Sequence, residues 1–434
     1  MSLQISWTKA TKEANEIQTL ALESILGAKV TKEMFRQASL RVTCGGLGIQ
    51  DAEQVSWAAY HASLIETINN CREHFTPSCL SFNLQDESWL IKANRERLQQ
   101  GFRHCQHIQA YTKQTLPTSV NQLNLFTWRV QKIISIAISR QAQADFKELL
   151  RSGPNKNAEL VRFQCAGLPH ASAYLSAIPS TRKLFMSNLT FKAALATRLG
   201  IRLPFALPHR CVCKAKQEEP GTVHLATCGS RGGPIKVHNR LRDTLMQMMS
   251  HARMNPIREV AAWKLVGPTE LGKQSFFDIV EGNTVYDVTV RHAGAKTKEK
   301  RSVANVNSNI EEGYKDKMKL LEKICAGITT LKLQPLVADK MGGLHKDLVK
   351  LVRDCQFRMG EKWVNEVNFA CPTFFRYYVQ VISCCIHSSV AIHSRELAMA
   401  AGFEEERPLI PDLLEPEELE SSRAQLWLKL RNID

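Results

Sequence analysis

The first half of the chain carries apolar residues at the three- and four-residue spacing of amphipathic helices. This pattern predicts helical segments at 8–27, 52–69, 76–165 and 191–200. Between the first two, residues 37–49 read as an extended strip that turns into the loop Gly45-Gly-Leu-Gly48. Glycine tolerates the positive φ angles of such a turn. The N-terminal half is therefore predicted to be almost entirely helical.

The period of the pattern shortens after residue 256. Short runs rich in β-branched and aromatic residues predict strands at 257–260, 276–280, 285–291 and 333–337. The second and third runs flank Glu281-Gly-Asn-Thr284, which indicates a hairpin. Further helices are predicted at 236–253, 306–326, 346–366 and 372–401, with Gly229–Pro234 as a linker before them. The fold class expected from this order is a multidomain α+β protein.

Composition narrows the class of protein. The 434 residues are enough for about two to four domains, and no apolar run reaches the length of a membrane span. The first residues have neither a basic nor an apolar stretch of the kind found in secretory signals, so the thirteen cysteines are expected to be reduced. The formal net charge of +15 favours a polyanionic partner, most simply nucleic acid.

One cysteine-rich segment has the spacing of metal ligands. Its sequence is Cys211-x-Cys213-x10-His224-x3-Cys228, and Pro220-Gly221 lies in the turn between the two pairs. Three thiolates and one imidazole complete the tetrahedral coordination of Zn²⁺ and leave no position for water. We therefore predict a structural zinc site. The alternative is a set of reduced cysteines placed by chance in a helical scaffold.

The predicted hairpin carries two acidic residues on neighbouring strands. Asp278 and Asp287 come close only if the register of the strands permits, and two adjacent carboxylates attract a hard cation such as Mg²⁺. Glu259 is a candidate third oxygen ligand. A following helix offers Lys317 as the best-placed ammonium, with Lys315 and Lys319 as alternatives.

Such a group of side chains suits phosphodiester hydrolysis. A metal lowers the pKa of bound water, and a lysine orients that water or stabilises the developing negative charge. Each part alone is also explained by surface carboxylates near a turn and by a solvated, lysine-rich helix face. The order Glu, Asp, Asp, Lys, with strands in the middle and a helix after them, favours the catalytic interpretation.

Other segments carry a resemblance to a known family. They are Gln37-Ala-Ser-Leu with Gly45-Gly-Leu-Gly-Ile49, Tyr174-Leu-Ser-Ala-Ile-Pro179, Arg198-Leu-Gly200, His238-Asn239, Pro335-Leu-Val337 with Gly342-Gly343, and Gln380-Val-Ile-Ser383. Together with the cysteines and aspartates, their order resembles the C-terminal half of reverse transcriptase polyproteins from non-LTR (LINE-type) retrotransposons with a restriction-like endonuclease. The resemblance covers most of the chain.

The sequence departs from that family at several points, one of which is a hairpin between the aspartates that is shorter than expected. Phe277 precedes Asp278 where the family has proline, and Val288-Thr289 follow Asp287 where a PD-(D/E)xK motif would have its lysine. The family places its lysine on the following helix, which here carries Lys317. The chain also has no Tyr-x-Asp-Asp sequence, so the polymerase palm is not expected in it.

The resemblance implies a domain order. It predicts a thumb-like remnant at 1–75, a helical connector at 76–200, a Cys-Cys-His-Cys zinc knuckle at 201–233, a restriction-endonuclease-like α/β/α domain at 234–400 and an acidic tail at 401–434. It also implies structural Zn²⁺, catalytic Mg²⁺ or Mn²⁺ and a nuclear location.

The activity implied by the resemblance is nicking of one DNA target strand. The partners would be DNA, the RNA of the element, and a separate or upstream reverse transcriptase palm. Residues expected to contact nucleic acid are Arg231, Lys236, His238, Asn239, Arg240 and Arg242. The alternative is a non-catalytic, zinc-containing remnant that still binds nucleic acid.

Overall fold

The computed structural model describes residues 2–74, 95–119, 122, 130–153, 155–205, 211–214, 222–267, 275–295, 298–326, 328–360 and 371–401. Apart from residue 401, the predicted acidic tail lies outside these ranges, as does the end of the helix predicted at 346–366. Within them the chain is a mixed α+β protein with one four-stranded sheet. No helix in the described ranges is both long and apolar enough to cross a membrane.

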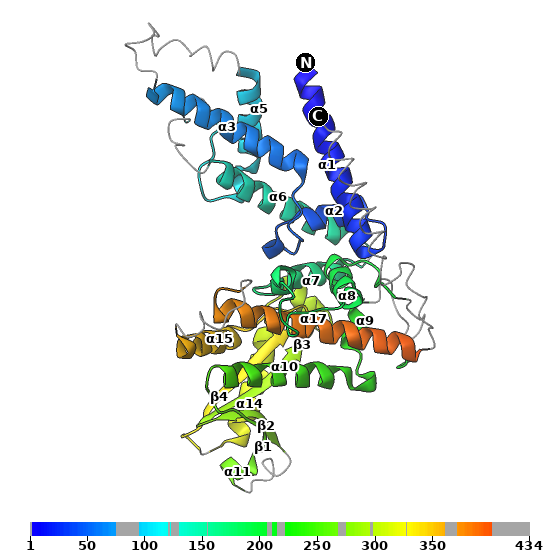
Figure 1. Ribbon diagram of the computed structural model, residues 1–434, viewed down its shortest axis with the longest axis vertical. Coiled ribbons are helices and arrows are strands. Elements are labelled where there is room, and N and C mark those ends of the chain that lie inside the picture. The colour runs from blue at the N-terminus through cyan, green and yellow to red at the C-terminus, as the bar shows by residue number, and fades with distance from the viewer. Residues whose placement is uncertain are drawn as a thin grey trace.

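The N-terminal part is helical, as predicted. It contains α1 (Ser2–Leu26), α2 (Lys32–Ser39), the 3-10 turn η1 (Val42–Cys44), α3 (Ala52–His74), α5 (Arg95–Ile108), η2 (Gln109–Tyr111) and α6 (Val130–Ser152). Figure 1 shows these helices at one end of the molecule, away from the sheet. One apolar cluster joins α3, α5 and α6, so the core of this part crosses the expected boundary at residue 75.

The extended strip predicted at 37–49 is wrong in its first half. Residues up to Ser39 belong to α2, a helix that Thr31 caps at its start by accepting a hydrogen bond from the Met34 N–H at 3.3 Å. A 3-10 turn follows. The glycine loop then packs tightly: a Cβ at Gly46 would come within 2.0 Å of the Leu40 carbonyl oxygen. These glycines therefore permit close packing of the backbone.

The middle of the chain leads into the sheet. It contains α7 (Lys156–Ala166), η4 (Ala173–Ser176), α8 (Asn188–Leu199), α9 (Thr222–Thr227), η5 (Ser230–Gly232) and α10 (Gly233–His251). The linker predicted at Gly229–Pro234 is instead a 3-10 turn that runs directly into α10. Pro234 stands in the first turn of that helix, where its missing N–H costs no hydrogen bond.

The four strands confirm the predicted hairpin. They are β1 (Ile257–Ala261), β2 (Phe276–Glu281), β3 (Thr284–Arg291) and β4 (Lys332–Asp339), in the order β1-β2-β3-β4. The first three run antiparallel, and β4 pairs parallel to β3. Between and after the strands lie α11 (Trp263–Val266), α13 (Glu299–Ala304), α14 (Ser308–Ile324), α15 (Lys346–Met359) and α17 (Phe374–Ala400).

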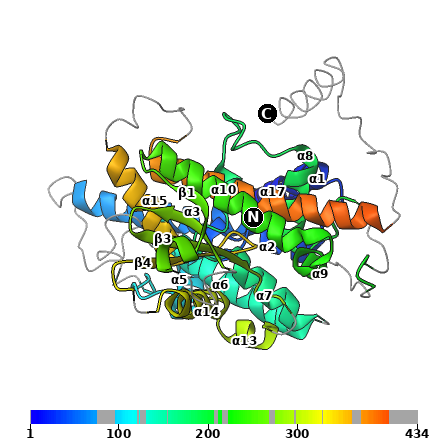
Figure 2. The ribbon, with the colours of Figure 1, turned by 90° about the horizontal axis from the view of Figure 1, so that it is seen from below.

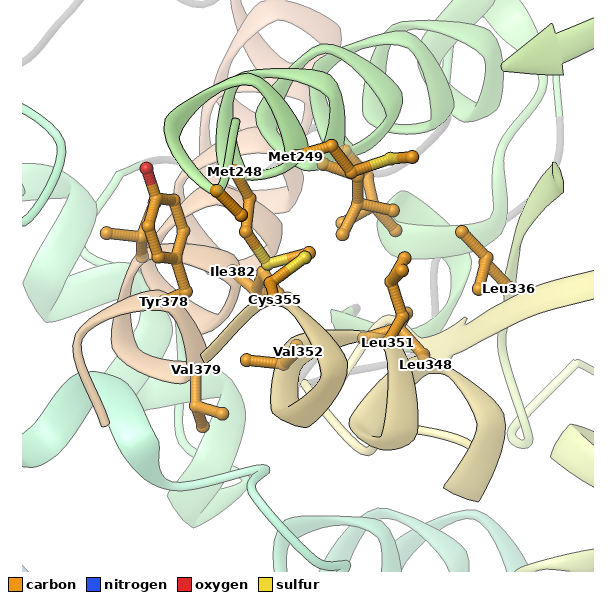
Figure 3. Packing of buried hydrophobic residues seen from close by; sticks show 14 of the residues in the cluster. Met248, Met249, Leu336, Leu348, Leu351, Val352, Cys355, Tyr378, Val379 and Ile382 are labelled. Carbon is orange, nitrogen blue, oxygen red and sulfur yellow. The ribbon is translucent and has the colours of Figure 1, made fainter. Parts of the chain in front are cut away.

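Helices cover both faces of the sheet. Figure 2 shows α10 and α17 on one side of the strands and α14 on the other. The larger core lies between the sheet and the helices α10, α15 and α17, with Met248, Leu351 and Ile382 among its fully buried side chains. Figure 3 shows these side chains meeting from the three helices. The helix α17 also packs on α8 and α9, so it joins the sheet to the middle of the chain.

A buried arginine links the N-terminal part to the middle helices. Arg198, at the end of α8, donates from Nε to the Gly46 carbonyl at 3.0 Å and from an Nη to the Val42 carbonyl at 2.7 Å. In return, the Gln37 amide donates to the Arg198 carbonyl at 2.8 Å. Arg162 of α7 donates to the same carbonyl and to the Gln37 amide oxygen. This network fixes the glycine loop against α7 and α8.

Candidate functional site

The four predicted zinc ligands come together. Their ligand atoms all lie within 4.8 Å of one another, with Cys211 Sγ 3.6 Å from Cys228 Sγ and Cys213 Sγ 3.3 Å from His224 Nε2. Bond lengths typical of zinc give edges of about 3.8 Å between sulfurs and about 3.6 Å between sulfur and nitrogen in a tetrahedron. The donor set and its dimensions therefore fit a metal ion such as zinc.

The cluster is tied to the sheet and to α17. Cys211 and Cys228 are buried in the apolar cluster that includes α8. His393 of α17 lies with Nε2 3.1 Å from the Cys228 carbonyl oxygen. The buried ammonium of Lys340, just after β4, donates to the Ala226 carbonyl. Three elements thus hold the segment that leads from the cluster into α10.

The two aspartates meet where the hairpin ladder stops. The paired residues of β2 and β3 end at Ile279 and Tyr286, and the next pair in this register is Asp278 with Asp287. Instead of continuing the ladder, the Val288 N–H donates to Asp278 Oδ2 at 2.7 Å. The carboxyl groups of Asp278 and Asp287 hydrogen-bond to each other. The strands therefore open at the point where both carboxylates lie.

One lysine of α14 reaches this pair. Lys317 Nζ lies 3.0 Å from Asp287 Oδ1 and 2.9 Å from Oδ2, whereas Lys315 and Lys319 are exposed. Gly313, one turn before Lys317, permits this approach, because a Cβ there would lie 2.9 Å from Arg291 Nε. Of the three lysines considered from the sequence, Lys317 is the one in contact with an aspartate.

His238 occupies a position that sequence reasoning missed. It was expected to contact nucleic acid, but its Nε2 lies 3.0 Å from Asp278 Oδ1. His238 is on α10, which packs against β2 and β3. Four side chains from two strands and two helices therefore form a chain of contacts: His238, Asp278, Asp287 and Lys317. Sequence separation hides this contact, because His238 precedes Asp278 by a helix and a strand.

The paired carboxyl groups differ in proton affinity. Burial and the hydrogen bond to Asp278 raise the pKa of Asp287 to about 7, although Lys317 acts to lower it. For Asp278, burial raises the pKa, but the hydrogen bonds with His238, Asp287 and Val288 outweigh it, so the pKa falls below its ordinary value. The pair therefore shares one proton at lower pH and becomes doubly negative near neutrality.

Glu259 and Arg242 have other partners. Arg242 is buried and forms ion pairs with Glu259 and Asp243, so its guanidinium is not a free contact for a phosphate. The Glu259 backbone has a φ of +47° and its carboxylate also faces Arg258 at 3.7 Å. Within the described residues, the side chains close enough together to share one metal ion are Cys211, Cys213, His224 and Cys228. Glu259 does not form a group of this kind with Asp278 and Asp287.

The remaining expected cations lie on the surface of α10 and of the turn before it. Arg231 and Arg240 are exposed, and Lys236 forms an ion pair with Glu396 at 2.6 Å. Asn239 is partly exposed and lines the same open pocket as His238 and Asp278, which has a volume of about 630 Å³. A phosphate entering this pocket would meet His238 and Asn239 on the helix side and Asp278 on the strand side.

No protein-family model matches this chain, and no curated protein matches it significantly. The function must therefore be argued from the geometry of the site together with the resemblance seen in the sequence.

Proposed function

We propose that this chain is a Mg²⁺- or Mn²⁺-dependent DNA endonuclease with a restriction-like α/β/α domain, built around Asp278, Asp287 and Lys317. The observation that carries the proposal is their contact: Lys317 Nζ is within 3.0 Å of Asp287, which is hydrogen-bonded to Asp278. Two carboxylates and one ammonium, placed on a strand pair and a helix, are the side chains that metal-assisted phosphodiester hydrolysis requires.

Each side chain has a separate part in the proposed reaction. Oxygens of Asp278 and Asp287 would hold the divalent ion, which when bound lowers the pKa of water and withdraws charge from the phosphate. Lys317 would orient the attacking water or stabilise the charge that develops on the phosphate. His238 fixes the rotamer of Asp278 through the contact at 3.0 Å.

The wider setting follows from the resemblance. We propose a target-strand nicking module of a non-LTR retrotransposon reverse transcriptase, acting in the nucleus on DNA, with element RNA and a separate or upstream palm domain as partners. The cysteine-histidine cluster would hold a structural zinc ion beside the N-terminus of α10. The exposed Arg231 and Arg240 would contact DNA phosphates.

The alternative is a zinc-containing nucleic-acid-binding remnant without catalysis. It is favoured by the ion pair between Lys317 and Asp287, which satisfies the carboxylate without a metal, and by the engagement of Glu259 with Arg242. Both proposals expect zinc and DNA binding. They differ in whether a phosphodiester bond is cut.

A nicking assay separates the two. Supercoiled plasmid is incubated at low salt with Mg²⁺ or Mn²⁺ and with wild type, Asp278→Asn or the matched control Asp316→Asn. Asp316 lies on α14 but faces Arg291 at 3.0 Å. We expect wild type and Asp316→Asn to nick, and Asp278→Asn to be inactive while retaining zinc. Nicking by Asp278→Asn at the wild-type rate would remove the site assignment, and plasmid left intact by wild type would favour the remnant.

A further inference from the structure

Two large apolar side chains beside Asp278 are exposed to solvent. Ile235 is 65% exposed and Phe276 is 64% exposed, and both line the pocket that contains His238 and Asp278. Single exposed apolar residues are common on proteins and need no explanation. Two of them that line one open pocket, on different elements and beside a carboxylate, indicate a common role.

The backbone directs both side chains to this pocket. Phe276 begins β2, two residues before Asp278. Ile235 stands in the first turn of α10, three residues before His238, so the two share one face of the helix. A group bound at Asp278 would therefore have an aromatic ring on the strand side and an aliphatic side chain on the helix side.

Charge indicates what such a pocket accepts. Arg231 is exposed just before α10, and the polar side chains His238 and Asn239 line the pocket itself. A ligand that binds both a cation and an apolar surface would carry negative charge along its backbone and have flat groups that stack on the apolar side chains. A nucleic acid strand has both properties, and aromatic side chains next to basic ones are typical of single-strand binding.

We propose that Phe276 and Ile235 receive the base next to the scissile phosphate, so that the preferred substrate is DNA with unpaired bases at the cut. The inference rests on the proposed endonuclease function. In a continuous duplex the bases are stacked inside, and exposing one costs a few kcal/mol. DNA that is already open avoids this cost, and the apolar side chains then contact the base face.

The test is a binding measurement in which cleavage cannot occur. Three fluorescent DNA probes of equal length are used: a single strand, a continuous duplex, and the duplex with a central run of mismatches. Anisotropy titrations in Ca²⁺ are done with wild type, Phe276→Ala, Ile235→Ala and Phe276→Trp. The matched control is Phe357→Ala, because Phe357 is 89% exposed on α15 and does not line the pocket.

We expect wild type to bind the mismatched duplex more tightly than the continuous one. Stacking of one base on an aromatic ring changes affinity by roughly five-fold to 150-fold, so Phe276→Ala should remove most of this preference. Ile235→Ala should remove part of it. Phe276→Trp should keep the preference, and Phe357→Ala should behave as wild type.

Each result bears on one of the two proposals. If wild type nicks plasmid but Phe276→Ala keeps the full preference for mismatched DNA, the stacking role is wrong and the endonuclease stands. If no preference exists in wild type, the stacking role is equally wrong. If the preference is present and depends on Phe276 but no nicking occurs, the base contact holds and the endonuclease function fails. Circular dichroism and zinc content exclude misfolding as the cause.

Discussion

Lys317 offers the sharpest test of the proposed site, because it contacts Asp287 whereas two other lysines of the same helix, Lys315 and Lys319, are exposed to solvent. Lys317→Met should lower nicking by roughly 100- to 1,000-fold, the range seen when one donor to a developing negative charge is removed. Lys315→Met and Lys319→Met are the matched controls on α14, since both side chains are exposed. Rates of plasmid nicking at saturating Mg²⁺ measure the effect. Equal losses in all three variants would mean that only the charge of the helix matters.

The proton shared by the aspartates predicts a pH dependence. The pKa of Asp287 is raised to about 7, and a protonated carboxyl is a poor cation ligand. At subsaturating Mg²⁺, nicking should therefore rise with pH through neutrality and level off above it. Lys317 acts to lower this pKa, so in Lys317→Met the residual activity should rise at higher pH than in wild type. A profile that is flat from pH 5 to 8 would contradict the assignment of Asp287.

At this scale the sequence placed the two aspartates on neighbouring strands but did not indicate the partners of His238 and Arg242. The alternation of the hairpin put Asp278 and Asp287 on neighbouring strands, and their contact follows from the register. The roles of His238 and Arg242 could not be predicted in the same way. Their contacts depend on how α10 lies across the sheet, and that position is set by core packing over residues far apart in the chain.

At the scale of elements, the segment from α9 into α10 is the one whose stability a bound metal would affect most. Cys228→Ser should lose the metal and lower the free energy of unfolding by more than about 4 kcal/mol, as loss of a structural metal typically does. Zinc content and thermal unfolding measure this. Cys44→Ser is the control, since Cys44 is partly exposed and outside the cluster. A Cys228→Ser protein with full zinc and unchanged unfolding would contradict the site.

Elements with strong periodicity were predicted well, and those without it were not. The strands and the long helices after residue 230 have regular apolar patterns, so their predicted centres agree with the structure. The stretch 37–49 has apolar residues at every second position only from 38 to 44 before its three glycines, a run too short to decide the conformation, and the prediction of an extended strip there was partly wrong. Carbonyl groups of this stretch accept hydrogen bonds from the distant Arg198, and a local pattern does not contain such contacts.

At the scale of the whole molecule, the segments that carry the family resemblance meet in space. The Gln37 and Gly45–Gly48 segment contacts Arg198, and Gln380 of α17 donates to the Ser176 carbonyl at 2.9 Å. The Tyr174 N–H donates to the Ser383 hydroxyl at 3.1 Å. The polar residues of these motifs thus join parts of the molecule, which explains why such residues stand in buried positions.

This arrangement predicts a large effect from one substitution. Arg198→Met would leave the Gly46 and Val42 carbonyls without these donors in a buried region, which should cost about 2–4 kcal/mol. Chemical denaturation measures the change. Arg202→Met, an exposed arginine four residues later, should have little effect. If the two variants unfold at the same denaturant concentration, the network does not hold the N-terminal part in place.

The position of α17 also has a consequence for how the chain folds as it is made. This helix packs against α8, α9, α10 and α15, yet it is synthesised after all of them. Until it leaves the ribosome, the apolar faces of those helices have no cover, and slow, long-range closure of this kind exposes a nascent protein to aggregation. Translation that stops before residue 371 should therefore yield insoluble protein, even though the cysteines, the aspartates and Lys317 have all been made.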